Sequence, residues 1–330
     1  MFSESAKSDI ANSALLSIIE SYVNYYATGK SHTARAKRLD LKAFVEFLQA
    51  YRGYGKPQSL KVRDWDFSAV QRFVDELLTR GEAPSTVARR LATIKHMGRA
   101  LAEKIPGFVN PAREIKAPRL KLDCPKALTK TEISQARERA RDRLGEKPSF
   151  IRLRNHTIFE LLLDTGLRAE EIRLLKLSQI DNGFEWIKSV RTKGRRFRNV
   201  YITSKMRPYL KRYLQERDKL LKKRFPRATK AMTLKLPLFI SLYAAKLAQP
   251  ETFLMGPKTI WRAIDELSNE THIHPHLLRH SFAIDLLDNS KDVRLVSQAL
   301  GHSDVRITMR YTERHDKDIA VALERSRKKR

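Results

Sequence analysis

Four histidines and one arginine fall within residues 272–280, where the sequence reads HIHPHLLRH. Pro275 suits the first position of a helix, because the N–H that proline lacks would have no partner there. On such a helix His276 and Arg279 lie three residues apart and share one face. The free N–H groups at a helix N-terminus attract phosphate. We therefore expect this imidazole and this guanidinium to hold a charged oxyanion.

A metal site is the alternative use of these histidines, since His276 and His280 have the i, i+4 spacing of zinc ligands. Zinc hydrolases with this spacing carry a glutamate between the two histidines as general base, whereas here the intervening residues are two leucines and an arginine. A guanidinium beside the site would also repel a cation. We therefore expect no metal, and we interpret His280 as a packing or hydrogen-bonding residue and His272 and His274 as loop residues.

Helices and one hairpin are expected to position these side chains. Residues 150–177 read as two helices separated at Gly166, because glycine is the usual C-terminal stop of a helix. Residues 184–202 read as two β-strands around a Lys-Gly turn, with aromatic and β-branched residues on each side. Farther along the chain, Gly301 ends a helix and residues 303–304 cap the next one.

The first third of the chain reads as a bundle of helices, near residues 8–27, 31–51, 67–80 and 83–104. Apolar residues keep helical spacing there, and Ser31 and Ser85 are the expected N-caps of two of the helices. Prolines and charges then interrupt the pattern until Thr129, which forms a capping box with Glu132. The sequence thus predicts a mainly α fold with a small β-hairpin, in which a domain at 1–115, a linker at 116–125 and a domain at 126–330 follow one another.

The charge balance indicates a polyanionic partner. The 330 residues include 66 Lys and Arg against 37 Asp and Glu, which gives a formal net charge of +29. Residues 188–235 alone hold 18 basic and 2 acidic residues, a surplus of 18 − 2 = 16. No stretch approaches the roughly 20 apolar residues of a membrane span, and no signal peptide is evident. These features, with the single Cys124, favour a nucleic-acid partner and a cytoplasmic, nucleoid-associated protein.

Five motifs occur in order along the chain: TGLRAEEIRLLKL, VRTKGRRFR, HPHLLRHSFA, LGHSD and TMRYT. Together they resemble the tyrosine recombinase (phage integrase) family of site-specific DNA recombinases. With the preceding NPAREIKAP segment and the helical bundle, the resemblance covers nearly the whole chain. It implies a core-binding (SAM-like) first domain and a mixed α/β catalytic second domain, with Glu171 or Glu170 in a supporting role. The implied catalytic residues are Arg168, Lys193, His276, Arg279, His302 and Tyr311.

The resemblance also implies a mechanism. The two arginines would stabilise the charge that a phosphodiester gains in its five-coordinate transition state, and His302 would donate a further hydrogen bond. His276 would take the proton of Tyr311, and Lys193 would protonate the departing 5′ oxygen. The product would be a 3′-phosphotyrosine link that conserves the bond energy for rejoining, so no metal, ATP or other cofactor is expected.

The expected partner is double-stranded DNA that carries an inverted-repeat recombination site. The resemblance implies a homo-tetramer on the DNA synapse, assembled from monomers or dimers, with two domains that clamp the duplex from opposite faces and no membrane partner. Accessory proteins stay an open possibility. Residues 316–330 would dock on a neighbouring protomer or contact DNA through their basic end, and the basic segment 222–250 has no assigned role.

Two alternatives remain open. A type IB topoisomerase shares this chemistry, but it usually carries a serine and a lysine just before its tyrosine, where this sequence has Thr308 and Met309. The other alternative is a DNA-binding relative without cleavage activity. Against it, each of the six implied catalytic positions holds a residue that could perform its role. The sequence does not select the target site or choose among integration, excision, inversion and dimer resolution.

Overall fold

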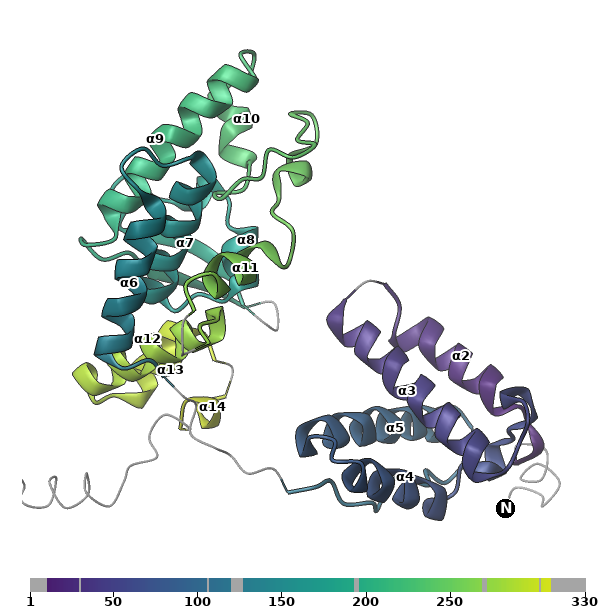
Figure 1. Cartoon of the computed structure of the whole chain (residues 1–330). Helices are drawn as coiled ribbons and strands as arrows, with labels where there is room; N and C mark the ends of the chain where they lie inside the picture. The colour runs from purple at the N-terminus through teal and green to yellow at the C-terminus, as the bar shows by residue number, and fades with distance from the viewer. Residues whose placement is uncertain are drawn as a thin grey trace, which may run out of the picture. The chain divides into compact units, whose positions relative to one another are not determined.

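The computed structural model describes residues 11–29, 31–105, 107–119, 127–192, 196–268, 272–302 and 304–309. The chain divides into two units, Met1–Lys121 and Leu122–Arg330. Both units are built mainly from helices, and the described part of the second adds one two-stranded sheet (Figure 1). This architecture confirms the expected mainly α fold with a small β-hairpin.

The helices of the first unit are α2 (Leu15–Tyr26), α3 (His32–Tyr51), α4 (Phe67–Thr79) and α5 (Pro84–Lys104). Ser31 caps α3 as expected, because its hydroxyl accepts a hydrogen bond from the Ala34 N–H at 3.1 Å. The expectation that Ser85 caps α5 is wrong. The N-cap is Ala83, two residues earlier, and it makes no side-chain hydrogen bond; the helix begins at Pro84, whose fixed φ suits the first helical position.

The segment after α5 belongs to the core of the first unit up to residue 115. Ala112 and Ile115 are buried among the apolar side chains of the bundle. Asn110 fixes the segment on α5, since its side-chain amide donates to the Lys95 carbonyl at 3.1 Å and accepts from the Ala112 N–H at 3.0 Å. Gly98 permits this approach, because a Cβ at that position would overlap the Asn110 side chain.

The second unit contains eight described helices of at least six residues, two strands and a last short helix: α6 (Lys130–Leu144), α7 (Phe150–Thr165), α8 (Ala169–Leu174), β1 (Trp186–Arg191), β2 (Phe197–Tyr201), α9 (Arg207–Arg224), α10 (Lys230–Lys235), α11 (Thr259–Asp265), α12 (Pro275–Ser290), α13 (Val293–Leu300) and α14 (Arg306–Met309). Helix α7 is central and contacts α6, α9, α11 and α12 (Figure 1). Apolar residues on several of its faces are buried, as expected for a helix enclosed by others. Thr129 and Glu132 form the expected capping box at the start of α6.

Strands β1 and β2 pair antiparallel, with Val190 opposite Arg198 and Arg191 opposite Phe197. The pairing is interrupted by a bulge, at which Ser189 adopts a φ of 53° and donates its N–H to the Asn199 side chain. The hairpin turn, residues 193–195, lies outside the described residues. The bulge changes the twist of a hairpin whose turn carries one of the expected catalytic residues.

Part of the basic segment 222–250 is structural. Residues 236–240 run beside the 175–177 turn, because the Leu238 N–H donates to the Leu175 carbonyl at 2.7 Å. The fully buried Arg217 of α9 donates to the Pro237 carbonyl at 3.0 Å. Buried guanidinium groups of this kind satisfy backbone oxygens that no water reaches.

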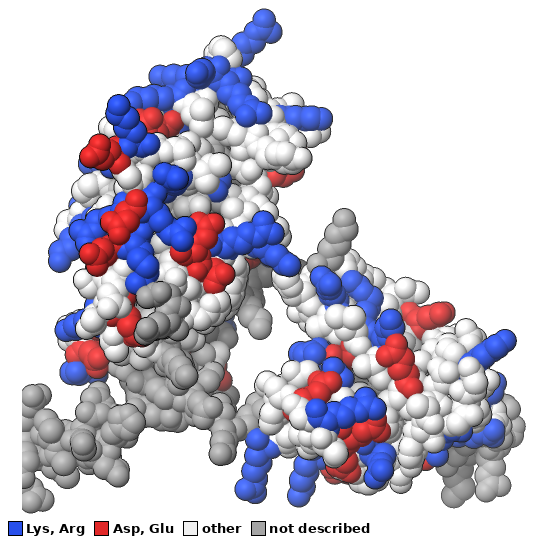
Figure 2. Space-filling model, viewed as in Figure 1, with Lys and Arg blue, Asp and Glu red and all other residues white. Residues whose placement is uncertain are grey.

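The basic surplus of residues 188–235 is therefore divided between surface and interior. Arg198 and Arg217 are buried, whereas Lys and Arg side chains gather over the outer ends of α9 and α10 (Figure 2). Acidic and basic side chains alternate over the middle of the same view (Figure 2). None of the described helices is both long and apolar enough to cross a membrane.

Candidate active site

The turn between α7 and α8 brings Arg168 to the N-terminus of α8. Helix α7 ends at Gly166, which has a φ of 59°, in the left-handed region that glycine adopts without strain. A Cβ at Gly166 would overlap the Phe282 ring of α12, so the turn and α12 are in direct contact. This close approach places the start of α8 beside the residues that α12 carries.

Glu171 connects the positive side chains of the site. Its carboxylate accepts from the Arg168 backbone N–H and from the Arg168 guanidinium, each at 2.9 Å. Arg198 of β2 donates to both carboxylate oxygens, at 3.1 and 3.0 Å, and Arg279 lies 4.0 Å away. Burial would raise the pKa of Glu171, but these hydrogen bonds and charges outweigh it and lower the pKa. Glu170, the other candidate for the supporting role, is exposed and pairs with a different arginine.

Arg279 is buried against two chain turns. One Nη donates to the Gly166 carbonyl, and the other donates to the Leu300 carbonyl at 2.8 Å and contacts His302 Nε2 at 3.3 Å. The guanidinium thus joins the end of α7, the end of α13 and the residue that follows α13. These contacts fix its position before any substrate binds, which is what a transition-state contact requires.

His302 follows Gly301, which ends α13 with a φ of 64°. Its Nδ1 lies 2.8 Å from the hydroxyl of the buried Thr308, and its Nε2 faces Arg279. Because Arg279 can only donate, we assign the proton of the ring to Nδ1. Burial and then the nearby Arg279, Arg168 and Arg198 lower the pKa of His302 to about 4. In this arrangement the ring is neutral and both nitrogens face protein groups, so the expected hydrogen bond to a phosphate requires the ring to change partners.

His276 lies exposed on the first turn of α12, with Pro275 at the first helical position as expected. His274 precedes it as the N-cap, because its Nδ1 accepts from the Leu277 N–H at 3.2 Å, so this residue is a cap as well as a loop residue. The Trp261 ring of α11 stacks on His274 and meets His276 edge to face. Partial burial, His274 and then the two catalytic arginine candidates lower the pKa of His276, which keeps its ring neutral and able to accept a proton.

The structure brings together three of the six expected catalytic residues, Arg168, Arg279 and His302, and places His276 on the helix that carries Arg279. Lys193 and Tyr311 lie outside the described residues. Two further members of the cluster, Arg198 and Thr308, were not selected by the sequence. Arg198 lies among several basic residues of one hairpin, and only its burial distinguishes it from them.

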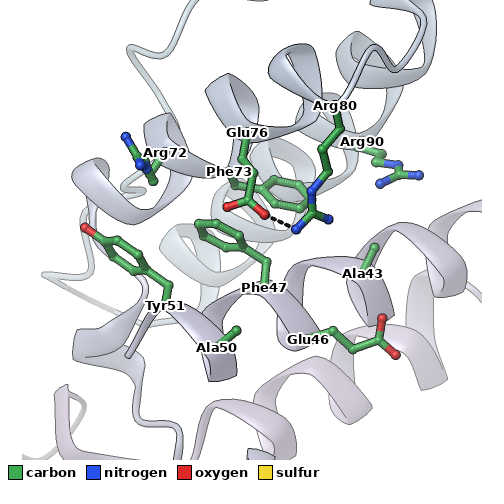
Figure 3. Close-up of a pocket in the computed structure, with 10 residues that line it drawn as sticks. All are labelled: Ala43, Glu46, Phe47, Ala50, Tyr51, Arg72, Phe73, Glu76, Arg80 and Arg90. Carbon is green, nitrogen blue, oxygen red and sulfur yellow. Dashed lines mark ion pairs between the residues drawn. The ribbon is translucent and has the colours of Figure 1, made fainter. Parts of the chain in front are cut away.

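The first unit has a separate pocket of about 630 Å³ between α3 and α4. The rings of Phe47, Phe73 and Tyr51 line it, and an ion pair of Glu76 with Arg80 closes one side (Figure 3). Its lining residues include no histidine, cysteine or serine. None of the six expected catalytic residues lines this pocket.

Comparisons with known sequences agree with the two units. Residues 126–318 match the Phage integrase family, and residues 19–104 match the Phage integrase, N-terminal SAM-like domain. Tyrosine recombinase XerC of Thermodesulfovibrio yellowstonii is 30% identical over 317 residues, which cover 93% of this chain and 95% of the relative. Tyrosine recombinase XerD of Lacticaseibacillus casei is 29% identical over 291 residues, which cover 87% and 89%.

Solved structures share the fold at low sequence identity. A pre-cleavage complex of XerH site-specific recombinase with its difH substrate has a TM-score of 0.65 and 18% identity, covering 88% of this chain and 78% of that chain. The Tn1549 transposon integrase bound to transposon right end DNA has a TM-score of 0.64 and 14% identity, covering 95% and 99%. A lambda integrase dimer bound to a core site has a TM-score of 0.60 and 16% identity, covering 91% and 96%.

Proposed function

The chain belongs to the phage integrase family and is a site-specific tyrosine recombinase, and from this premise we propose which of its residues cut and rejoin DNA. The proposed set is Arg168, Lys193, His276, Arg279, His302 and Tyr311. One observation carries the proposal: two arginines distant in sequence share Glu171, and one of them contacts His302. Such a cluster of fixed cations suits a phosphodiester that gains negative charge as it reacts.

In the proposed cleavage step the phenol oxygen of Tyr311 attacks a backbone phosphorus in line. The bond from phosphorus to the tyrosine oxygen forms as the bond to the 5′ oxygen breaks. His276 accepts the phenolic proton, and Lys193 gives a proton to the departing 5′ oxygen. The reverse reaction, with the 5′ hydroxyl of another strand as the nucleophile, rejoins the DNA. The energy of the broken ester stays in the 3′-phosphotyrosine, so ATP has no part in the cycle.

In this proposal the two units have different roles in binding and cleaving DNA. Residues 1–115 form a core-binding domain, residues 116–125 a linker, and residues 126–330 the catalytic domain. The net charge of +29 supports duplex DNA as the partner, with contacts mainly to phosphates. By family resemblance we expect an inverted-repeat target, a tetramer on the synapse and a cytoplasmic, nucleoid-associated protein.

The test first needs a target sequence, which can be found by selecting the duplexes that the protein binds from a randomised pool. A nick in the cleaved strand, shortly to the 3′ side of the cleavage point, then traps the covalent product, because the short piece with the free 5′ hydroxyl diffuses away. We expect wild-type protein to form a DNA adduct through a 3′-phosphotyrosine, and Tyr311→Phe to bind the duplex without forming one. An adduct retained by Tyr311→Phe contradicts the assignment of the nucleophile. A bound duplex that wild-type protein never cleaves would favour the silent DNA-binding relative.

A further inference from the structure

We propose that Arg198 is a positioning residue for strand cleavage, which neutralises Glu171 so that Arg168 and Arg279 keep their charge for the phosphate. The inference rests on the proposed function and adds to it a residue outside the proposed catalytic set. Arg198 lies on β2, opposite Val190, and its side chain is 8% exposed. A guanidinium this deeply buried needs a partner that compensates its charge.

Glu171 is that partner. The two Nη atoms of Arg198 donate to the two carboxylate oxygens at 3.1 and 3.0 Å, which is the paired geometry of a strong arginine–carboxylate bond. The charge of the Glu171 carboxylate is therefore balanced by Arg198. Its contacts with Arg168 at 2.9 Å and Arg279 at 4.0 Å then orient those side chains without cancelling their charge.

The charges of the cluster show why this matters. Three guanidinium groups surround one carboxylate, which leaves a net charge of 3 − 1 = +2. Without Arg198, the carboxylate would be shared by the two catalytic arginines alone, and the net charge would fall to 2 − 1 = +1. A phosphodiester that gains a second negative charge in the transition state would lose part of its stabilisation, and Glu171 would compete with it for N–H donors.

A second contact places Arg198 beside Gly301, the residue before His302. A Cβ built on Gly301 would lie 2.8 Å from Arg198 Nη1 and 2.9 Å from Thr192 Cγ2, so the guanidinium packs against the backbone just before His302. Arg198 also follows the hairpin turn closely on β2. From the strand that follows the turn carrying Lys193, it therefore contacts Glu171 of α8 and the backbone at the end of α13.

The test measures single-turnover adduct formation on the nicked duplex for matched variants. Arg198→Met keeps much of the side-chain volume without the charge, and we expect it to slow cleavage about 30-fold or more while DNA affinity stays within about threefold. Glu171→Gln added to Arg198→Met removes the unbalanced carboxylate and should recover about tenfold of the lost rate. Arg198→Lys should lie between wild type and Arg198→Met, because lysine keeps the charge without the paired geometry.

Arg207→Met is the matched control. Arg207 braces the other end of the same hairpin, through an ion pair with Glu185 at 2.9 Å and a hydrogen bond to the Tyr201 hydroxyl at 2.9 Å. Its loss should lower the melting temperature less than the loss of Arg198, because this ion pair is more exposed, and should leave the cleavage rate unchanged. A purely architectural Arg198 would give the same result as this control.

Each outcome decides between the explanations. The inference is overturned if Arg198→Met cleaves within about threefold of wild type, or if the double variant with Glu171→Gln cleaves no faster than Arg198→Met. A wild-type protein that forms no adduct would overturn the proposed function and this inference together. The melting temperature, followed for every variant, shows whether a slow variant is folded, and Arg198→Lys carries the test if the methionine variant does not fold.

Discussion

Gly166 is the residue whose substitution tests the packing of the site most directly. Its φ of 59° costs alanine about 1 kcal/mol, and a Cβ there would overlap the Phe282 ring. Forcing a methyl group into a packed contact adds about 1 to 3 kcal/mol. Gly166→Ala should therefore lower the free energy of unfolding by about 2 to 4 kcal/mol, which corresponds to a fall of roughly 5 to 15 °C in the melting temperature of a unit of this size.

The same substitution should also reduce cleavage, because the Gly166 carbonyl accepts a hydrogen bond from Arg279. Thermal and urea denaturation measure the first effect, and single-turnover cleavage of the nicked duplex measures the second. Gly53→Ala is the control, since Gly53 has a φ of 71° and no atom within 4 Å of a Cβ. It should cost only the backbone strain and leave cleavage unchanged. Equal losses of stability in the two variants would refute the argument that contact with Phe282 limits this position.

Three further predictions concern other contacts. Thr308→Val removes the hydroxyl that faces His302 Nδ1, so the buried N–H of the ring loses its acceptor. This variant should cleave about tenfold more slowly with unchanged DNA affinity. Equal single-turnover cleavage rates for the variant and the wild type would contradict this. Folding lowers the pKa of His302 from 6.5 to about 4, so between these pH values the unfolded chain binds the proton more strongly than the folded chain. Lowering the pH from 6.5 to 4 should therefore destabilise the second unit, by at most about 3 kcal/mol, and by less to the extent that solvent screens the ring. His302→Gln should flatten that dependence in urea titrations. Gly98→Ala should destabilise the first unit by about 2 to 3 kcal/mol and expose residues 107–115 to proteases, because its Cβ overlaps Asn110; an unchanged digestion pattern would contradict it.

Short-range signals in the sequence predicted helix ends well. The capping box of Thr129, the stop at Gly166 and Pro275 at the start of a helix are all confirmed. Each depends on groups only a few residues apart, so the local sequence contains the whole cause. Ser85 shows the limit of such signals, because Pro84 next to it was the stronger determinant of where the helix begins.

Long-range packing explains what the sequence could not supply. The spacing of His276 and Arg279 predicted a shared helix, but the depth of Arg279 depends on carbonyl groups from two other segments. The low pKa of His302 depends on burial and on three arginines that the fold brings together, and the position of its ring proton depends on Thr308. Arg198 was hidden for the same reason, since its partner Glu171 is 27 residues away in the chain.

The anchored ends of the segment between the units set a limit on how far they can separate. Ile115 is buried in the core of the first unit, and Leu128 is buried in the second, where its N–H donates to Ser281. The 128 − 115 = 13 residue steps between them span at most about 45 Å. Once either unit is on a duplex, the other is held nearby at a local concentration that reaches roughly millimolar for short tethers. If both units bind DNA, as in the proposed function, lengthening the segment between them should lower the affinity of the whole chain while leaving the affinity of each separate unit unchanged.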